Sequence, residues 1–513
     1  MSARPIVWSV AGSDSGGGAG LQADLRAFEA FGLHGCTAVA AITAQNSVAV
    51  HEVQAVSPAL LDAQLAALAD DLPPRAIKTG LLGSVDNLRV LVRWVRRLRE
   101  HAPVALVVDP VWRASTGAAM SGENLRRALR EELLPLTTVV TPNRAEAAWL
   151  LGMPALSGDA ALAQAAHELA VPAVLITGGD DATDCARDWL LSPQAEGWLS
   201  LPTIRTRHSH GSGCTFASSI AAALALGYCE ADAAVLAKMA TALGLRESGA
   251  AGAGAGPVRP RAGFASDGSL LPRLLARGQD SLTRAFASTG PQPMGLYAVV
   301  DSAEWVARVA AAGVRTVQLR IKQAAEAALD RQVRDAVAAA ERHGVRLFVN
   351  DHWRLAMKHR AYGVHLGQQD LGDADVAALA EAGIRLGLSS HAPWEVARAW
   401  ALEPSYIACG PVHATQTKHM PWMPQGEDNL AYWCSLLPCP VVAIGGLDAA
   451  RAQEAARCGA DGVAVLSGIT AAPDPQAAVE RYLRAVQAGR QAARRVPPAL
   501  PRPTLPGPAY MPT

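Results

Sequence analysis

The chain has 513 residues, 50% of them hydrophobic and 18% charged, which is the composition of a globular protein too long to form a single core. Its 46 basic and 46 acidic residues give a formal net charge of zero, so no overall field favours nucleic acid or an anionic membrane. The eight cysteines contain no C-x-x-C pair, which argues against a zinc site or a disulfide scaffold. No apolar run approaches the roughly 18 residues of a membrane span, and no N-terminal targeting signal is visible, so we expect a cytoplasmic protein with two domains.

Short β-branched runs alternate with Ala/Leu-rich stretches from Ile6 to about Thr206. This alternation predicts a mainly parallel, doubly wound α/β sheet with helices on both faces. The predicted strands cover residues 6–11, 38–43, 76–79, 106–109, 139–141 and 173–177. Several of them end in polar or glycine-rich loops. Because ligands of open α/β sheets bind at the carboxyl ends of the strands, we expect these loops to meet at one crevice.

The stretch His210-Gly211-Ser212-Gly213-Cys214 precedes a run of small residues, 215–227, that predicts a buried helix. Its two glycines allow a tight turn and bring backbone N–H groups close to a ligand. The free N–H groups at the start of that helix favour a phosphate, although a simple helix cap would explain the same residues. On the first turn, the helix dipole is expected to lower the thiol pKa of Cys214.

Six segments, AGSDSGGGAGLQADL, AITAQNS, KTGLLGS, VVDPVWRASTG, TPNRAEA and HGSGCTFASSIAAAL, occur in the order and spacing of the hydroxymethylpyrimidine (phosphomethylpyrimidine) kinase family. Residues 5–262 resemble this family, which implies a ribokinase-like fold and ATP-dependent phosphorylation, first of the hydroxymethyl group and then of the monophosphate. The resemblance assigns Gly12 and Gln45 to the pyrimidine, Asn143 and Glu146 to ATP and Mg²⁺, Thr177 and Gly179 to the nucleotide, and Gly211, Gly213, Cys214 and Lys238 to the transferring phosphoryl group.

Some residues in these segments also have structural explanations. Asp109 and the Asn143-x-x-Glu146 pattern are plausible helix starts, and Lys78 is equally explained as a solvated lysine at the end of a strand. The pair Trp112-Arg113 departs from the smaller apolar residues that are usual in the family. We expect this departure to alter the rim of the pyrimidine pocket.

The second half of the chain has a regular rhythm. Residues 1–262 are assigned to the kinase domain, and 263–293 to a linker that is partly helical around 270–286. Beyond it, eight short β-like runs mostly alternate with helical segments, which predicts a (β/α)8 TIM barrel over residues 294–488. The runs are 296–300, 317–320, 347–350, 363–366, 386–389, 406–410, 441–445 and 462–466. The proline-rich residues 489–513 are expected to form a disordered tail.

Acids, cations and hydroxyls follow the predicted barrel strands, at the end where barrel active sites lie, and they indicate a highly anionic, metal-bound ligand. The segments YAVVDS, QLRIK, FVNDHWRLA, GVHLGQQDL, LGLSSH, TQTK and AIGGL resemble thiamine-phosphate synthase from about residue 295 to 486. The resemblance assigns to the pyrimidine diphosphate Gln318, Leu319, Arg320, Ile321, Lys322, Asn350, Ser389 and Lys418. It assigns Asp351 and Asp370 to Mg²⁺, and to the thiazole phosphate Thr415, Gln416, Thr417, Gly446, Leu466 and Ser467.

Two points in the second half leave room for other interpretations. Asp370 precedes a predicted helix and is also explained as its N-cap. The sequence Pro411-Val412-His413-Ala414 departs from the Phe-Pro that the family generally has before the threonine, which puts the shape of that loop in doubt.

The two resemblances together predict a bifunctional enzyme of thiamine biosynthesis. It would make hydroxymethylpyrimidine diphosphate with ATP and then join it to thiazole phosphate, with release of pyrophosphate. Its partners would be these small molecules and Mg²⁺, with neither nucleic acid nor membrane, and a homo-oligomer is compatible with the sequence. Two alternatives stay open: a pyridoxal kinase in the first domain, or one domain that senses thiamine metabolites without turnover.

Overall fold

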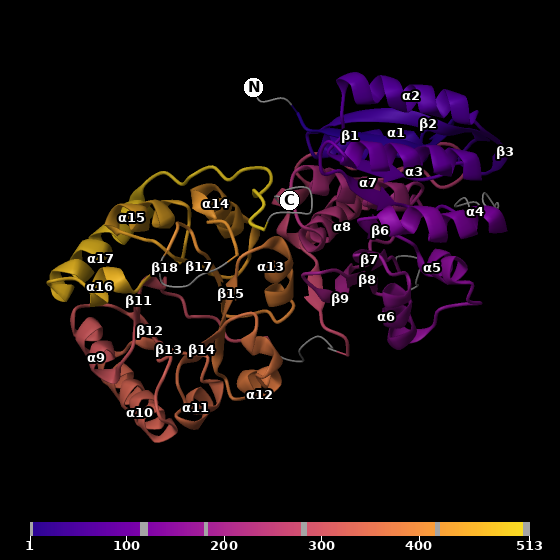
Figure 1. Ribbon diagram of the computed structural model, residues 1–513. Coiled ribbons are helices and arrows are strands. Elements are labelled where there is room, and N and C mark those ends of the chain that lie inside the picture. Colours follow the sequence, from indigo (N-terminus) through magenta and orange to yellow (C-terminus); the bar gives the residue numbers. More distant parts are fainter. Residues whose placement is uncertain (1–3, 113–121, 179–182, 279–284, 416–420, 506–513) are drawn as a thin grey trace. The chain divides into compact units, whose positions relative to one another are not determined.

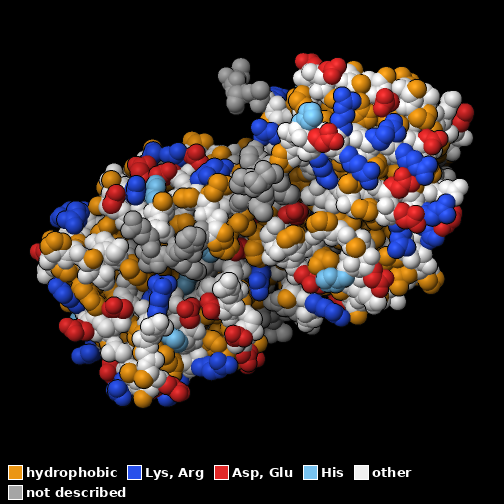
Figure 2. All heavy atoms as spheres, in the orientation of Figure 1, with side chains coloured by type: hydrophobic (Ala, Val, Ile, Leu, Met, Phe, Trp, Pro, Cys, Tyr) orange, Lys and Arg blue, Asp and Glu red, His pale blue; other side chains and the backbone are white. Residues whose placement is uncertain are grey.

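The computed structural model of the chain describes residues 4–112, 122–178, 183–278, 285–415 and 421–505 (Figure 1). These residues form two compact units, one that extends to residue 278 and one that covers 285–504. Basic and acidic side chains are interspersed on the face drawn in Figure 2, in keeping with a net charge of zero. Within the described ranges, no helix combines the length and apolarity needed to cross a membrane.

The first unit contains a ten-stranded sheet in the order β10-β9-β8-β7-β6-β5-β4-β1-β2-β3. The six predicted strands are all present and parallel, as β1 (Ile6–Asp14), β2 (His34–Gln45), β4 (Ala76–Thr79), β5 (Ala105–Val108), β6 (Val139–Val140) and β7 (Ala173–Ile176). Four antiparallel strands that the sequence pattern did not indicate extend the two edges: β3 (Val50–Ala55), β8 (Cys185–Leu191), β9 (Glu196–Pro202) and β10 (Arg273–Leu275).

Eight α-helices are described in this unit: α1 (Gly20–Ala30), α2 (Pro58–Asp71), α3 (Val85–Arg99), α4 (Glu123–Ala128), α5 (Arg144–Leu151), α6 (Gly158–Glu168), α7 (Ser212–Ala225) and α8 (Glu230–Arg246). The predicted buried helix is α7, in which every residue from Thr215 to Ala225 is buried. It packs against α1, α8 and the central strands β4 and β5. Its first turn therefore lies beside the carboxyl ends of the central strands.

The predicted linker differs from the structure. Two 3₁₀ turns, Phe264–Ser266 and Gly268–Leu270, lead into β10, which pairs with β9 and so belongs to the first sheet. Pro272 explains why the apolar spacing of this stretch does not continue as a helix, because proline has no N–H and its ring clashes with the preceding turn. The first unit therefore extends beyond the predicted boundary at residue 262.

The second unit is a closed barrel of eight parallel strands in chain order, as predicted. The strands are β11 (Gly295–Val300), β12 (Thr316–Leu319), β13 (Arg346–Asn350), β14 (Gly363–Leu366), β15 (Arg385–Ser390), β16 (Tyr406–Cys409), β17 (Val441–Ile444) and β18 (Gly462–Val465). The described helices of this unit are α9 (Ala303–Ala311), α10 (Glu326–His343), α11 (Trp353–Lys358), α12 (Val376–Glu381), α13 (Pro393–Trp400), α14 (Gly426–Leu436), α15 (Ala449–Arg457), α16 (Ser467–Thr470) and α17 (Pro475–Gln491). The barrel core includes buried aromatic rings of Tyr297, Phe348 and Tyr406.

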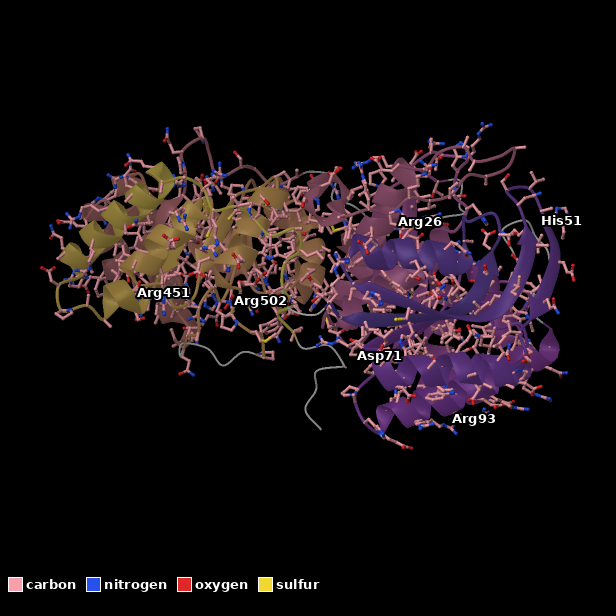
Figure 3. The ribbon with its side chains drawn as sticks, turned by 90° about the horizontal axis from the view of Figure 1, so that it is seen from above. Arg26, His51, Asp71, Arg93, Arg451 and Arg502 are labelled. Atoms are coloured by element: carbon pink, nitrogen blue, oxygen red, sulfur yellow. The ribbon has the colours of Figure 1, made fainter. Side chains whose placement is uncertain are left out.

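The proline-rich tail is not disordered as far as the structure describes it. Residues 492–504 follow α17 and are hydrogen-bonded to the barrel unit: Thr504, which is 1% exposed, donates to the carbonyl of His391 at 2.6 Å. Arg502, labelled in Figure 3, belongs to the same segment. The high proline content did not prevent order here, because backbone groups of the tail find partners on the barrel.

Candidate active sites

A cavity of about 740 Å³ lies in the first unit at the carboxyl ends of its parallel strands. The carboxyl ends of β1, β2, β4, β5, β6 and β7, or the loops that follow them, contribute to its lining, together with the start of α7. The cavity brings together nine of the residues singled out in the sequence: Gly12, Gln45, Asn143, Glu146, Thr177, Gly211, Gly213, Cys214 and Lys238. Gly179 and Arg113 lie outside the described residues. The predicted meeting of distant loops at one crevice is what the fold produces.

Lys78 is fully buried at the cavity wall. The alternative interpretation of Lys78 as a solvated lysine at the end of a strand is therefore wrong. Its ammonium lies 2.9 Å from a carboxylate oxygen of Asp24 on α1 and 3.4 Å from one of Asp109 after β5. Ser9 and Ser218 donate hydrogen bonds of 2.5 and 2.6 Å to Asp24. Burial acts to lower the pKa of Lys78, but the neighbouring acids outweigh it and raise that pKa above its ordinary value. Lys78 therefore carries its charge inside the protein.

The thiol of Cys214 belongs to this cluster, and the sequence-based expectation of a lowered pKa is wrong. Burial, together with the Asp109 and Asp24 carboxylates, raises the pKa of Cys214 to about 12, and Lys78 only partly opposes this shift. The dipole of a helix N-terminus is worth too little to offset desolvation and two nearby acids. Burial also raises the pKa of Asp109. At neutral pH Cys214 is consequently a protonated thiol beside a buried acid.

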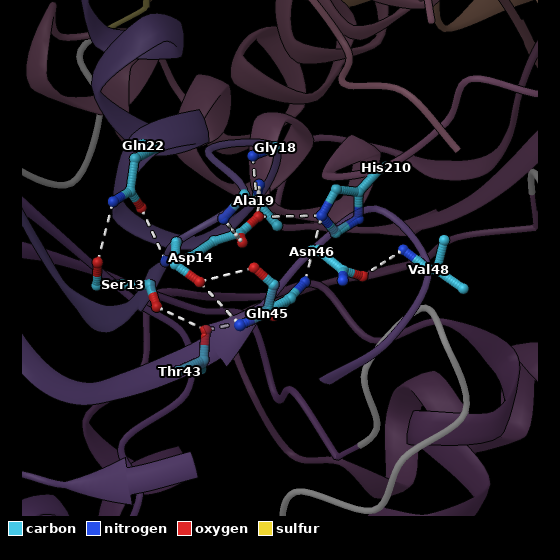
Figure 4. Close-up of polar contacts among 12 residues, drawn as sticks. Ser13, Asp14, Gly18, Ala19, Gln22, Thr43, Gln45, Asn46, Val48 and His210 are labelled. Atoms are coloured by element: carbon cyan, nitrogen blue, oxygen red, sulfur yellow. Dashed lines mark hydrogen bonds and ion pairs between the residues drawn. The ribbon is translucent and has the colours of Figure 1, made fainter. Parts of the chain in front are cut away.

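Asp14, which received no role from the sequence, organises the loop after β1 (Figure 4). Its carboxylate accepts hydrogen bonds of 2.8 to 2.9 Å from three backbone N–H groups, those of Gly16, Gly18 and Ala19. It also lies 3.0 Å from Nε2 of His210, and that nitrogen lies 3.3 Å from the side-chain amide nitrogen of Gln45. Burial alone would raise the pKa of Asp14, but the contacts with His210 and the backbone N–H groups lower it below its usual range. The result is an ionised carboxylate that joins β1 to the loop before α7.

The close approach of His210 explains one glycine of that loop. A Cβ atom built on Gly18 would lie 2.2 Å from the imidazole ring, so only glycine fits at this position. The signal for Asp14 was visible in the sequence, because a lone acid in a glycine-rich loop after a buried strand commonly holds backbone N–H groups.

The side of the cavity assigned to ATP contains a helix cap and a buried ion pair. Asn143 and Glu146 form a capping box at the start of α5, with two reciprocal hydrogen bonds of 2.8 Å, so the helix-start interpretation is correct for them and they line the cavity as well. Lys238 on α8 lies 2.7 Å from Asp188 and donates to a backbone carbonyl at 3.1 Å. Asp188 was missed because it lies on β8, an antiparallel strand that the pattern did not indicate.

Trp112, the departure noted after β5, lines the same cavity. Its ring stacks on Trp149 of α5, with centroids 5.6 Å apart and planes 8° from parallel. The unusual side chain is therefore held against α5 by a second aromatic ring.

In the second unit, the assigned residues gather at one end of the barrel. Gln318, Leu319, Asn350 and Ser389 lie at the ends of their strands, while Arg320, Ile321, Lys322, Gly446, Leu466 and Ser467 follow β12, β17 and β18 directly. Thr415 is the last described residue before a gap, and the predicted site residues Gln416, Thr417 and Lys418 lie outside the described residues. All described members thus occupy the carboxyl ends of the strands, where barrel enzymes bind their substrates.

Asp351 and Asp370 lie close to each other at this end. Burial raises the pKa of Asp351, and the nearby Asp370 carboxylate raises it further. Asp370 is not the N-cap of the following helix: it accepts a 3.0 Å hydrogen bond from the N–H of Gly367, and Asp375 caps α12. Two neighbouring carboxylates are a suitable donor set for a divalent cation.

The number of acids also fits Mg²⁺. Among the described residues, no group of three or more His, Cys, Asp or Glu side chains is arranged to hold a metal ion. Mg²⁺ is usually held by one or two carboxylates and keeps water and phosphate oxygens as its other ligands.

A buried chain of hydrogen bonds runs through the barrel core to Ser389. The Gln318 amide donates to Tyr297 at 3.3 Å, the Tyr297 and Tyr406 hydroxyls lie 2.9 Å apart, and Tyr406 lies 2.7 Å from Nδ1 of His365. The other ring nitrogen of His365 lies 2.9 Å from the hydroxyl of Ser389. Burial lowers the pKa of His365 to about 4, so its ring is neutral at physiological pH. Sequence patterns do not indicate this chain of hydrogen bonds, because its members come from five different strands.

Comparison with known proteins places each unit. A phosphomethylpyrimidine kinase family model matches residues 14–259, and a thiamine monophosphate synthase model matches 296–469. The thiamine-phosphate synthase of Serratia proteamaculans is 48% identical over 207 residues, which cover 40% of this chain and 97% of that protein. A solved pyridoxal kinase of Bacillus subtilis in complex with ADP is 33% identical, with a TM-score of 0.47, over 50% of this chain and 98% of that one.

One relative spans both units. The thiamine biosynthetic bifunctional enzyme of Arabidopsis thaliana is 34% identical over 483 residues, which cover 91% of this chain and 90% of that protein. The chain therefore belongs to the family of bifunctional thiamine biosynthetic enzymes, in which a phosphomethylpyrimidine kinase is fused to a thiamine-phosphate synthase.

Proposed function

We propose that the first unit phosphorylates hydroxymethylpyrimidine and then its monophosphate with ATP, and that the barrel joins the resulting diphosphate to thiazole phosphate. The observation that carries the kinase part is the single cavity that unites residues from six strand ends with the start of α7. The observation that supports the synthase part is the gathering of cations and two acids at one end of the barrel.

The pyrimidine is proposed to bind between Gly12 and Gln45. A primary amide presents one donor and one acceptor to the matching edge of an aminopyrimidine. The position of Gln45 is supported by His210, 3.3 Å away, which is itself held by Asp14. The ring of the substrate would then lie over the loop that Asp14 fixes.

The phosphoryl group is proposed to pass over the start of α7. The backbone N–H groups of the loop from Gly211 to Cys214 suit the charge of the transferring group, and the paired Lys238 supplies a cation from α8. Because Cys214 keeps its proton at neutral pH, it is not available as a thiolate base that removes the substrate proton before transfer. Such an arrangement suits a loose phosphoryl-transfer transition state, in which positioning and charge stabilisation dominate. Mg²⁺, when bound near Asn143 and Glu146, would neutralise charge on the ATP phosphates.

In the barrel, Asp351 and Asp370 would hold Mg²⁺, which when bound would neutralise the diphosphate. Arg320 and Lys322 are proposed to stabilise the pyrophosphate as the bond between it and the pyrimidine methylene breaks. The bonding electrons leave with pyrophosphate, and the aminopyrimidine ring stabilises the methylene cation. The thiazole nitrogen then donates its lone pair to that carbon, which completes thiamine phosphate without a protein base.

The test is a coupled assay on the intact chain. Hydroxymethylpyrimidine, ATP and Mg²⁺ should give the monophosphate and then the diphosphate, and added thiazole phosphate should give thiamine phosphate and pyrophosphate. Cys214→Ala should slow the first stage strongly and leave coupling of supplied diphosphate unchanged, since Cys214 lies in the kinase cavity.

The same assay separates the alternatives. Efficient phosphorylation of pyridoxal, with little turnover of hydroxymethylpyrimidine, would assign the first unit to vitamin B6 instead. Binding of thiamine metabolites without product in either stage would indicate a sensor and refute the proposal.

A further inference from the structure

The C-terminal segment, residues 496–505, is attached to the barrel beside the end of the unit that carries the proposed synthase site. Asn429 of α14, 1% exposed, donates its amide to the carbonyl of Arg502 at 2.8 Å and accepts from the N–H of Arg502 at 2.7 Å. A primary amide, with one acceptor oxygen and an N–H donor, suits both backbone groups of one residue. The Arg502 guanidinium also donates to the carbonyl of Pro424. These contacts fix the position of the segment relative to α14 and Pro424.

Thr504 connects this segment to two parts of the barrel at once. Its hydroxyl donates to the carbonyl of His391 at 2.6 Å, and its own carbonyl accepts from the N–H of Met423 at 2.8 Å. Thr504 is buried although it lies 13 residues beyond Gln491, where α17 ends. Such burial of a polar residue in a tail requires the partners that it finds here.

The two parts that Thr504 joins are also tied to each other. Gln425, 1% exposed, donates to the same carbonyl of His391 and accepts from Asn429 at 3.1 Å. The ring of His391 stacks on Trp422 with centroids 4.4 Å apart, and its Nδ1 lies 2.7 Å from Glu395. The segment Trp422–Gln425 and the turn at His391 thus form one hydrogen-bonded unit that the tail closes.

Both parts adjoin residues of the proposed synthase site. His391 comes two residues after Ser389, whose hydroxyl ends the buried chain from Tyr297. Trp422 to Gln425 directly precedes α14, which begins at Gly426. A change in the attachment of either part would therefore move backbone next to substrate-binding residues.

We propose that the C-terminal segment positions this end of the barrel for the synthase reaction, with Arg502 and Thr504 as positioning residues. The inference rests on the proposed synthase function. Without the segment, the His391 carbonyl and the Met423 N–H lose buried partners, and the backbone on both sides of the site gains freedom that substrates must remove on binding. The expected effect is a fall in synthase kcat/KM of about tenfold or more, mainly through a higher KM, with kinase turnover unchanged.

The first test compares two truncations of the full chain. A chain that ends at Arg495 lacks the whole C-terminal segment, whereas one that ends at Leu505 keeps it and serves as the matched control. The longer truncation should show the loss in synthase kcat/KM, and the control should match the intact chain. Addition of a synthetic peptide of residues 496–510 should lower the raised KM part of the way to the value of the intact chain. A general loss of stability would not be reversed in this way.

Point variants keep the inference testable if the longer truncation does not fold. Thr504→Val removes the donor at nearly constant volume and should raise the synthase KM, while Thr504→Ser should retain it. Val496→Ala, at a site 84% exposed, should have no effect. If the intact chain couples the substrates and both the longer truncation and Thr504→Val keep its kcat and KM, the inference is wrong. If the intact chain itself shows no coupling, the proposed synthase function fails instead.

Discussion

Removal of the buried cation at position 78 should destabilise the kinase unit far more than the loss of any surface charge. Lys78→Met keeps the length of the side chain but leaves the Asp24 and Asp109 carboxylates without the ammonium that lies 2.9 and 3.4 Å from them. Removing one partner of a buried ion pair costs about 3–5 kcal/mol, because the remaining charge is buried and uncompensated. A domain of this kind is stable by only about 5–15 kcal/mol, so the loss is a large share of the total.

The assay is urea inactivation of the full chain, with kinase and synthase activity measured in parallel. With a urea m-value of about 2 kcal/mol/M, the midpoint of kinase inactivation should fall by roughly 1.5–2.5 M. The synthase midpoint should not move. Arg93→Met is the matched control, because Arg93 pairs with Asp62 at 3.6 Å on the outside of α3 with 63% of its side chain exposed (Figure 3). Exposed pairs contribute about 0–1 kcal/mol, so its midpoint should shift by less than about 0.5 M.

A second substitution tests the cause of the loss. Asp24→Asn, added to Lys78→Met, removes one of the two carboxylates that have lost their cation. It should recover part of the lost stability, with a coupling free energy of about 1–3 kcal/mol between the two substitutions. If Lys78→Met unfolds at the same urea concentration as Arg93→Met, or if Asp24→Asn adds a further loss of the same size as in the parent, the buried charge cluster does not contribute as argued.

Three further outcomes are expected. Because burial raises the pKa of Cys214 to about 12, iodoacetamide at pH 8 should alkylate it much more slowly than the exposed Cys185, and equal rates in peptide mapping would refute the protonated thiol. Asp351→Asn and Asp370→Asn should each shift the Mg²⁺ dependence of coupling from supplied pyrimidine diphosphate to higher concentrations, and curves that overlay the parent would mean that these acids are structural. Chains divided after residue 278 should keep both half-reactions in separate fragments, because the first sheet ends with β10 before that point; two insoluble fragments would contradict independent units.

The parallel strands were predictable because each is a short apolar run that ends in a polar or glycine-rich loop. All eight barrel strands and the six parallel strands of the first sheet occur where the pattern indicated them. The strands that were missed, β3 and β8 to β10, are antiparallel additions at the edges and interrupt the alternation of strand and helix. Asp188, the partner of Lys238, was missed for that reason.

The electrostatic state of the kinase cavity could not be predicted from local sequence. Lys78 follows the pattern of any lysine near the end of a strand, and its burial depends on Asp24 from a helix 54 residues earlier. The pKa of Cys214 likewise depends on acids that only the fold brings near it. The ordered structure of the tail could not be predicted from local sequence either. Thr504 is held by hydrogen bonds to backbone groups of the barrel, which are distant in the sequence.

The closed barrel has a consequence for the time course of synthesis. β11 and β18 pair along their length, with Gly295 beside Gly462 and Ala298 beside Val465. The chain must therefore grow by about 170 residues after β11 before its closing strand exists, which takes roughly 8–34 s at 5–20 residues per second. During that interval one edge of β11 has no partner and is open to pairing with another chain. The first sheet is complete at β10, so a nascent chain carries a finished kinase sheet while its barrel is still open.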